Sequence, residues 1–322
     1  MYTIKIFVII LAISVHQCTI IDSTEAGNLV PLTVDENPSL PSLVINGTLL
    51  HVETVGNPSD PIIILLHGGP GGDNTAFSKS KSFSSDGFFV VSFDQRGSGL
   101  SRRHSDKSLF THKVFFEDLR QLINHFKLNV THKVFLLGHS WGAMYATGFT
   151  NKYPDMVNGL VLSEPGGFTW SDMMSYVEKT RALELFSEAL NDALWTEQFI
   201  SSNSHELLDY RLASFSIGES NTGDIKTPPF TRFGAFCSNS MFEHGMEVGL
   251  DYTTNLTAYT NKVLFLYSEL NISYGFDHAK KVSSAFSNVE LIEIKGAGHM
   301  LTHFSFDQYH TKALTYLNER LL

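Results

Sequence analysis

One ten-residue stretch constrains the fold of this chain more than any other. Four apolar residues, Val134 to Leu137, lead directly into Gly138-His139-Ser140-Trp141-Gly142, and helix-favouring residues follow. This order predicts a strand, a sharp turn and a helix, with the serine hydroxyl exposed at the end of the strand. Both glycines are expected because strand and helix pass too close there for a side chain. The stretch therefore predicts a nucleophilic serine, Ser140.

Three other apolar runs also end in turns that could carry chemistry. Ile62–Leu66 ends in His67-Gly68-Gly69-Pro70-Gly71-Gly72, and residues 88–93 end in Asp94-Gln95-Arg96-Gly97-Ser98-Gly99-Leu100-Ser101. A shorter run, residues 160–162, ends at Ser163-Glu164-Pro165. Apolar runs without alternation are typical of strands that are buried on both faces. Parallel sheets place ligands at the carboxyl ends of their strands, where these turns stand.

The remaining pattern predicts an α/β fold, with a mostly parallel central sheet and helices on both faces. Asn46-Gly47 predicts a hairpin within residues 43–55, and apolar spacing predicts a helix over residues 114–126. Strands are expected at 263–267 and 291–294, and a last helix at 305–321. The core would comprise residues 23–167 and 260–322. Residues 168–259, with helices expected at 175–190 and 192–202, would form a helical cap inserted after the sixth strand.

The predicted serine needs a base and an oxyanion site. His299 follows the last predicted strand in the turn Gly296-Ala297-Gly298, so it is the expected general base. Two backbone N–H groups would bind the oxyanion, those of Trp141 and Gly69. His303 lies four residues after His299, but no further ligand spacing accompanies it, so no metal site is expected.

Charge and the N-terminus bear on partners and location. The 322 residues include 23 Lys plus Arg against 33 Asp plus Glu, a net charge of -10, without a basic cluster. Nucleic acid is therefore excluded as a partner. Residues 6–15 form an apolar run after one lysine, too short to span a bilayer, which predicts a signal peptide over residues 1–22 and secretion. An uncleaved anchor is the alternative, and the sequence carries no signal for the oligomeric state.

The cysteine content and the glycosylation sequons agree with the predicted secretion. The two cysteines are Cys18 and Cys237, and the first falls within the predicted signal peptide, so no disulfide or cysteine-based metal site is expected. Four sequons suit a secreted glycoprotein, at Asn46, Asn129, Asn255 and Asn271.

Three motifs in this order resemble the prolyl aminopeptidase (proline iminopeptidase) branch of the α/β-hydrolase superfamily. They are the HGGPGG turn at 67–72, DQRGSGLS at 94–101 and GHSWG at 138–142; GAGHM at 296–300 extends the resemblance to the other end of the core. The resemblance covers about residues 40–165 and 260–322, and not the cap. It implies a serine hydrolase without cofactor that acts on the N-terminal residue of small peptides, or on related amides and esters.

The third triad member departs from that branch. The usual acid position, after the penultimate strand, falls on Asn271, whose neutral amide cannot stabilise an imidazolium. Glu164 stands at the end of the strand after the elbow helix, where some other superfamily members carry their acid. We therefore expect Glu164 to be the acid and Asn271 to be a vacated site. A salt bridge or a substrate-amine contact is the alternative role of Glu164, and Glu269 and Asp277 are weaker candidates.

Two functions remain open on sequence grounds. The first is a serine hydrolase, either aminopeptidase-like or a carboxylesterase or lipase-like enzyme. The second is a catalytically weak or silent relative that acts as a binding protein. The neutral Asn271 at the usual acid position is the reason to consider it. An aminopeptidase must hold a free ammonium group, and Glu243 and Glu247 of the cap are candidate carboxylates.

Overall fold

The computed structural model describes residues 30–129, 131–180, 205–215, 222–224, 226 and 229–322. The predicted signal peptide and the helix expected at 192–202 lie outside these residues. Most of the helix expected at 175–190 also lies outside them.

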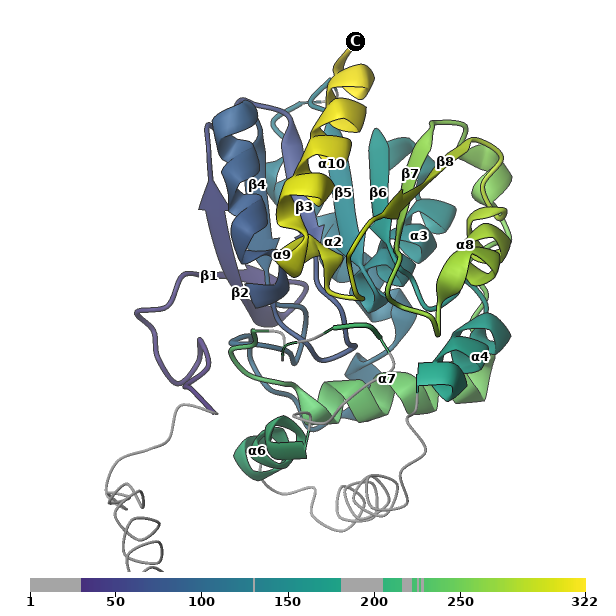
Figure 1. The fold of residues 1–322 in the computed structure, drawn as a ribbon. Coiled ribbons are helices and arrows are strands. Elements are labelled where there is room, and N and C mark those ends of the chain that lie inside the picture. Colours follow the sequence, from purple (N-terminus) through teal and green to yellow (C-terminus); the bar gives the residue numbers. More distant parts are fainter. Residues whose placement is uncertain (1–29, 130, 181–204, 216–221, 225, 227–228) are drawn as a thin grey trace, which may run out of the picture.

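An eight-stranded sheet forms the centre of the molecule (Figure 1). The strand order is β1-β2-β4-β3-β5-β6-β7-β8; β2 is antiparallel to β1 and to β4, and all other neighbours are parallel. The predicted mostly parallel sheet is therefore confirmed. The strands are β1 (Ser42–Ile45), β2 (Thr48–Val55), β3 (Ile62–Leu66), β4 (Phe89–Phe93), β5 (Val134–His139), β6 (Gly159–Ser163), β7 (Val263–Ser268) and β8 (Val289–Ile294).

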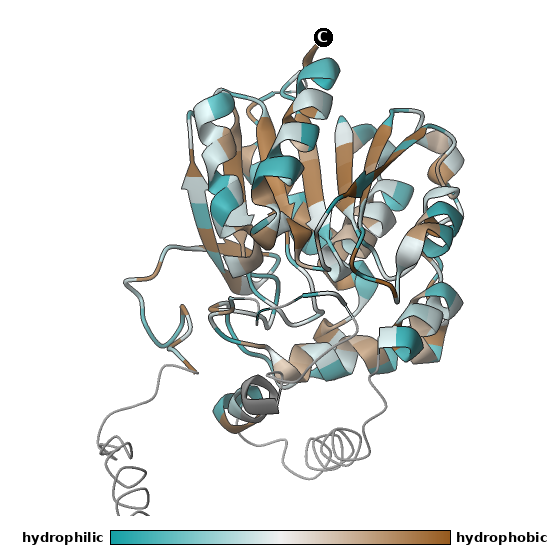
Figure 2. Ribbon diagram, in the orientation of Figure 1, coloured by the Kyte–Doolittle hydropathy of each residue, from teal (hydrophilic) through white to brown (hydrophobic). Residues whose placement is uncertain are grey.

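The continuous apolar runs form strands because both faces of the sheet are covered. All five residues of β3 are buried, and they alternate between two hydrophobic clusters. Ile62, Ile64 and Leu66 face one cluster, whereas Ile63 and Leu65 face the other. Figure 2 shows the resulting hydrophobic colour along the central strands. The hairpin turn also forms as predicted, with positive φ at both Asn46 (46°) and Gly47 (72°).

Helices α2 and α3 contribute to one of these clusters, and η1 and α10 to the other. The sequence did not predict the 3₁₀ segment η1 or helix α8. None of the helices that the structure describes is both long and apolar enough to cross a membrane. The longer helical elements are η1 (Asn74–Asp86), α2 (His112–Phe126), α3 (Trp141–Lys152), α4 (Trp170–Thr180), α6 (His205–Phe215), α7 (Ala235–Val248), α8 (Gly275–Ser283), α9 (Leu301–Phe304) and α10 (Phe306–Leu321).

Helices α4, α6 and α7 follow β6 and precede β7, and they lie together beyond one end of the sheet (Figure 1). Polar contacts join α6 and α7 to the core. Asp209 of α6 accepts a hydrogen bond from Arg103 of the core at 3.0 Å, and one from Arg232 of the cap region at 2.8 Å, all three side chains being buried. On α7, Glu243 pairs with Lys107 at 2.7 Å. The limits of the cap, 168–259, stay a prediction.

Candidate active site

Ser140 occupies a strained turn between β5 and α3. Its backbone has φ 53° and ψ −122°, a region that L-residues rarely adopt. The flanking glycines are required: a Cβ on Gly142 would lie 1.8 Å from the Leu66 carbonyl oxygen, and one on Gly138 would lie 2.5 Å from the Gly142 oxygen. The turn is fixed by the Ser140 N–H, which donates to the Ser163 oxygen at 2.8 Å. The predicted elbow geometry is therefore present.

The glycine-rich loop after β3 packs directly against this turn. A Cβ on Gly68 would lie 3.2 Å from the Ser140 Cβ, and Gly69 adopts φ +128° with two backbone nitrogens only 2.6 Å from where its Cβ would stand. Trp141 is the first residue of α3, so its N–H has no acceptor within the helix. The roles of Gly69 and Trp141 as oxyanion donors stay predictions.

Gln95 ties the two loops together, a role that its sequence position did not reveal. Its side chain donates to the His67 carbonyl oxygen (2.8 Å) and accepts from the indole N–H of Trp141 (3.1 Å). Its backbone N–H donates to His67 Nε2 at 2.9 Å, so the imidazole proton lies on Nδ1. Burial lowers the pKa of His67, which keeps this ring neutral.

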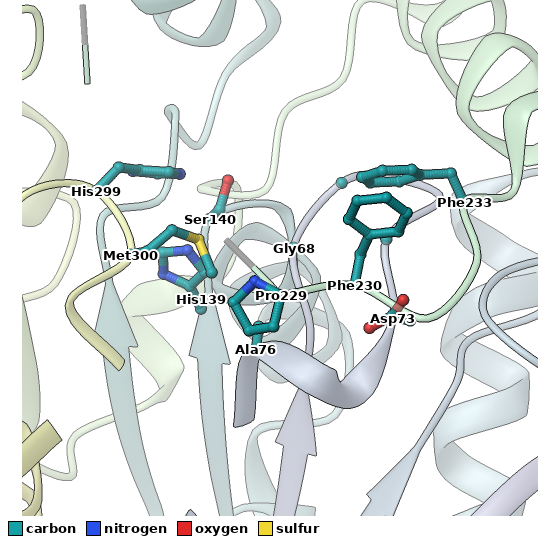
Figure 3. A pocket seen from close by; sticks show the side chains of 12 residues that line it. Gly68, Asp73, Ala76, His139, Ser140, Pro229, Phe230, Phe233, His299 and Met300 are labelled. Atoms are coloured by element: carbon teal, nitrogen blue, oxygen red, sulfur yellow. The ribbon is translucent and has the colours of Figure 1, made fainter. Parts of the chain in front are cut away.

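His299, which follows β8, contacts Glu164, which follows β6. His299 Nδ1 lies 2.7 Å from Glu164 Oε2, and the glutamate is completely buried. The other carboxylate oxygen, Oε1, accepts from the N–H (2.7 Å) and hydroxyl (2.5 Å) of Ser268 in β7. A carboxylate held this way directs the Nδ1 proton of the imidazole and leaves Nε2 to act as a base. Figure 3 shows a ring nitrogen of His299 directed toward the Ser140 hydroxyl.

Asn271 lies beside this pair rather than in contact with open solvent. Its side chain is completely buried, and Nδ2 donates to Glu164 Oε2 (2.9 Å) and to the Tyr176 hydroxyl (3.0 Å). The same Nδ2 would carry a glycan at this sequon, so the fold leaves no room for modification there. Glu269 is exposed and pairs with Lys295 at 3.1 Å. Within the described part of the chain neither Glu269 nor Asp277 contacts His299.

A cavity of about 200 Å³ opens beside the serine (Figure 3). Its wall brings together the glycine-rich loop, Ser140, His299 and a cap segment that contributes two aromatic rings. Asp73 is the one carboxylate among the described wall residues, and its oxygens accept from the backbone N–H groups of Thr75, Thr231 and Arg232. The wall consists of Gly68, Gly69, Gly72, Asp73, Ala76, His139, Ser140, Pro229, Phe230, Phe233, His299 and Met300.

The two candidate carboxylates of the cap are not among the described residues of the cavity wall. Glu243 pairs with Lys107, and Glu247 is exposed on α7; neither contributes to the cavity wall. The sequence could not place these two carboxylates, because the face that a cap helix turns to the site depends on tertiary packing. No cluster of three or more His, Cys, Asp or Glu side chains suited to a metal ion occurs among the residues that the structure describes.

Comparison with known proteins shows the fold family of this chain. The profile of the α/β-hydrolase fold family matches residues 61–305. A proline iminopeptidase of Clostridium botulinum is 33% identical over 145 residues, 44% of this chain and 46% of that protein. One of Arabidopsis thaliana is 36% identical over 113 residues, 35% of this chain and 29% of the relative. The chain thus matches half or less of the length of these two curated relatives.

Solved structures share the fold over most of the chain. A proline iminopeptidase-related protein from Thermus thermophilus has a TM-score of 0.61 at 23% identity, covering 88% of this chain and 99% of that one. The proline iminopeptidase of Mycobacterium smegmatis has a TM-score of 0.60 at 16% identity, covering 88% and 98%. At these identities the likeness concerns the fold alone. Taken with the family profile, it means that this chain belongs to the α/β-hydrolase family.

Proposed function

We propose that the protein is a serine hydrolase in which Ser140, His299 and Glu164 form the catalytic triad. The observation that carries this proposal is the 2.7 Å contact between His299 Nδ1 and Glu164 Oε2, which follow β8 and β6, next to a strained Ser140 between β5 and α3. Triads are recognised by such geometry rather than by sequence position.

The reaction follows from the roles of these groups. Ser140 Oγ attacks the substrate carbonyl while His299 Nε2 takes its proton, and Glu164 stabilises the imidazolium that forms. The backbone N–H groups of Gly69 and Trp141 stabilise the oxyanion. His299 then protonates the leaving group, and a water molecule activated by the same base releases the acyl group from Ser140.

For the substrate, we favour an aminopeptidase-like activity on small peptides, since the curated relatives are proline iminopeptidases. One observation favours a second candidate, an esterase for apolar acyl groups. The described cavity wall is formed largely by glycines and by Ala76, Phe230, Phe233 and Met300, and the oxygens of Asp73 are already engaged by backbone N–H groups.

A fluorophosphonate probe tests the nucleophile. We expect the purified protein to be labelled, Ser140→Ala to abolish labelling, and Ser92→Ala, which changes a buried serine of β4, to keep it. Folded protein that resists the probe would instead favour a catalytically silent binding protein.

A substrate panel separates the two hydrolase candidates. It would contain proline, alanine and leucine p-nitroanilides, their N-acetylated forms, and p-nitrophenyl acetate and butyrate. An aminopeptidase loses at least about 100-fold in kcat/KM when the amine is acetylated, because its ammonium contact is lost. If the protein hydrolyses the esters but none of the free-amine substrates, it is an esterase.

A further inference from the structure

Glu164 adopts a backbone conformation that needs support. Its φ is 45°, in the left-handed region that non-glycine residues rarely occupy. The N–H of Glu164 donates to the Leu266 oxygen of β7 at 3.0 Å, and Ser268 of the same strand holds the carboxylate. Support for this residue therefore comes from the neighbouring strand and the loop that follows it.

The loop after β7 and the helix α8 that follows it also hold the two residues after Glu164. The Tyr274 hydroxyl donates to the Pro165 carbonyl oxygen at 2.8 Å, and His278 Nε2 donates to the Gly166 oxygen at 2.8 Å. Burial lowers the pKa of His278, which keeps it a neutral donor. The loop where relatives of this branch usually carry the acid, together with α8, thus holds the segment that carries Glu164.

Two side chains complete the arrangement at the carboxylate itself. Asn271 Nδ2 bridges Glu164 Oε2 and the Tyr176 hydroxyl, which in turn lies 3.4 Å from His299 Nδ1. Tyr176 belongs to α4, and its ring packs against those of Tyr274 (centroids 5.1 Å apart) and His278 (5.7 Å). A residue of the cap region therefore reaches the imidazole–carboxylate pair.

We propose that Asn271 and Tyr176 are positioning residues that hold Glu164 against His299. Through Tyr176, the packing of α4 against the core then affects the reactivity of Ser140. This inference rests on the proposed triad. Both side chains are neutral, which suits the role: the amide donates to Glu164 Oε2 without competing for the imidazole proton. A carboxylate at position 271 would lie about 3 Å from Glu164, where two like charges cannot both persist.

The test uses the rate of Ser140 labelling by a fluorophosphonate as a function of pH, since this readout needs no identified substrate. Asn271→Asp would make the two carboxylates share a proton at mildly acidic pH. We expect labelling at least tenfold slower near pH 6, with the acidic limb of the profile moved upward by about one pH unit. Tyr176→Phe should slow labelling about three- to tenfold, and the control Tyr153→Phe, at the far end of α3, should not change it.

The outcomes separate this inference from the triad itself. The positioning role is overturned if both folded variants label at the wild-type rate with an unshifted pH profile. If Glu164→Gln loses labelling at the same time, the triad still stands. Unchanged labelling in Glu164→Gln would overturn both. If Asn271→Asp does not fold, Tyr176→Phe alone decides, because it removes one hydroxyl and keeps the ring contacts.

Discussion

Replacing Glu164 by glutamine is the sharpest perturbation of the proposed site. Each carboxylate oxygen accepts two hydrogen bonds: Oε1 from the N–H and hydroxyl of Ser268, and Oε2 from His299 and Asn271. A glutamine has only one acceptor oxygen, so its NH₂ group must face donors on one side. No orientation of the amide reproduces the wild-type pattern.

Either orientation impairs catalysis. With its NH₂ toward His299, the imidazole must take the tautomer that has its proton on Nε2, which cannot accept a proton from Ser140. With its NH₂ toward Ser268, the imidazole keeps its tautomer but loses the charge that stabilises the imidazolium. The same exchange in serine protease triads lowers kcat about 10⁴-fold, or about 5 kcal/mol of barrier. We expect a loss of about 10³- to 10⁴-fold in labelling rate and kcat/KM.

The matched control is Glu269→Gln, which changes an exposed carboxylate of the next loop and should stay within about twofold of the wild type. A partial rescue is expected from Glu164→Gln combined with Asn271→Asp. Asn271 Nδ2 and His299 Nδ1 contact the same Glu164 oxygen, at 2.9 and 2.7 Å, so a carboxylate at 271 stands next to the imidazole. A fall of less than about tenfold in folded Glu164→Gln protein would refute the relocated acid.

Three further predictions concern stability and the oxyanion loops. Burial, the His244 ring and nearby lysines lower the pKa of His112 to about 4. Since the unfolded imidazole binds a proton below about pH 6.5 and the folded one only near 4, stability falls as the pH falls through this window. The half-exposed ring limits the effect to about 1 kcal/mol, and a smaller difference in Tm between pH 7.5 and 4.5 in His112→Gln than in the wild type would verify it. Gly142→Ala forces its Cβ onto a backbone oxygen of β3, so thermal unfolding should show a loss of about 3 kcal/mol or no folded protein. Gln95→Leu leaves two buried partners unpaired, so urea unfolding should show a loss of about 2–4 kcal/mol, and labelling of Ser140 should slow.

Elements whose signal is local were predictable from the sequence. The run Ile62–Leu66 forms β3 residue for residue, because five apolar side chains without alternation are typical of a strand covered on both faces. Segment η1 was missed because its mean apolar content is low and serines and lysines dominate it. Helix α8 was missed because nine residues are too few for a secure helical pattern, although its buried face packs against β7 and β8.

The residues of the candidate site also divide into those with a local sequence signal and those without one. Ser140 and His299 were predictable because each follows a strand in a glycine-rich turn, and parallel strands bring such turns to one edge. Gln95 and Tyr176 were not, since their partners lie far away in the chain and depend on side-chain direction. Tyr176 meets His299 across 123 sequence positions, and Gln95 meets Trp141 across 46.

The pairing of strands explains how the proposed acid could stand at either of two positions. β6 and β7 are parallel neighbours, with Ser163 opposite Leu266, and adjacent strands lie about 4.8 Å apart. A glutamate at the end of β6 is one methylene longer than an aspartate, and its carboxylate reaches β7, where it accepts hydrogen bonds from Ser268. The carboxylate then reaches the imidazole nitrogen that an acid after β7 would serve. Once Glu164 fills that place, a second carboxylate at 271 would add repulsion, whereas an amide adds a hydrogen bond. Asn271 and Glu164 therefore depend on each other. Either Asn271→Asp or Glu164→Gln alone should lower the activity more than the two substitutions together.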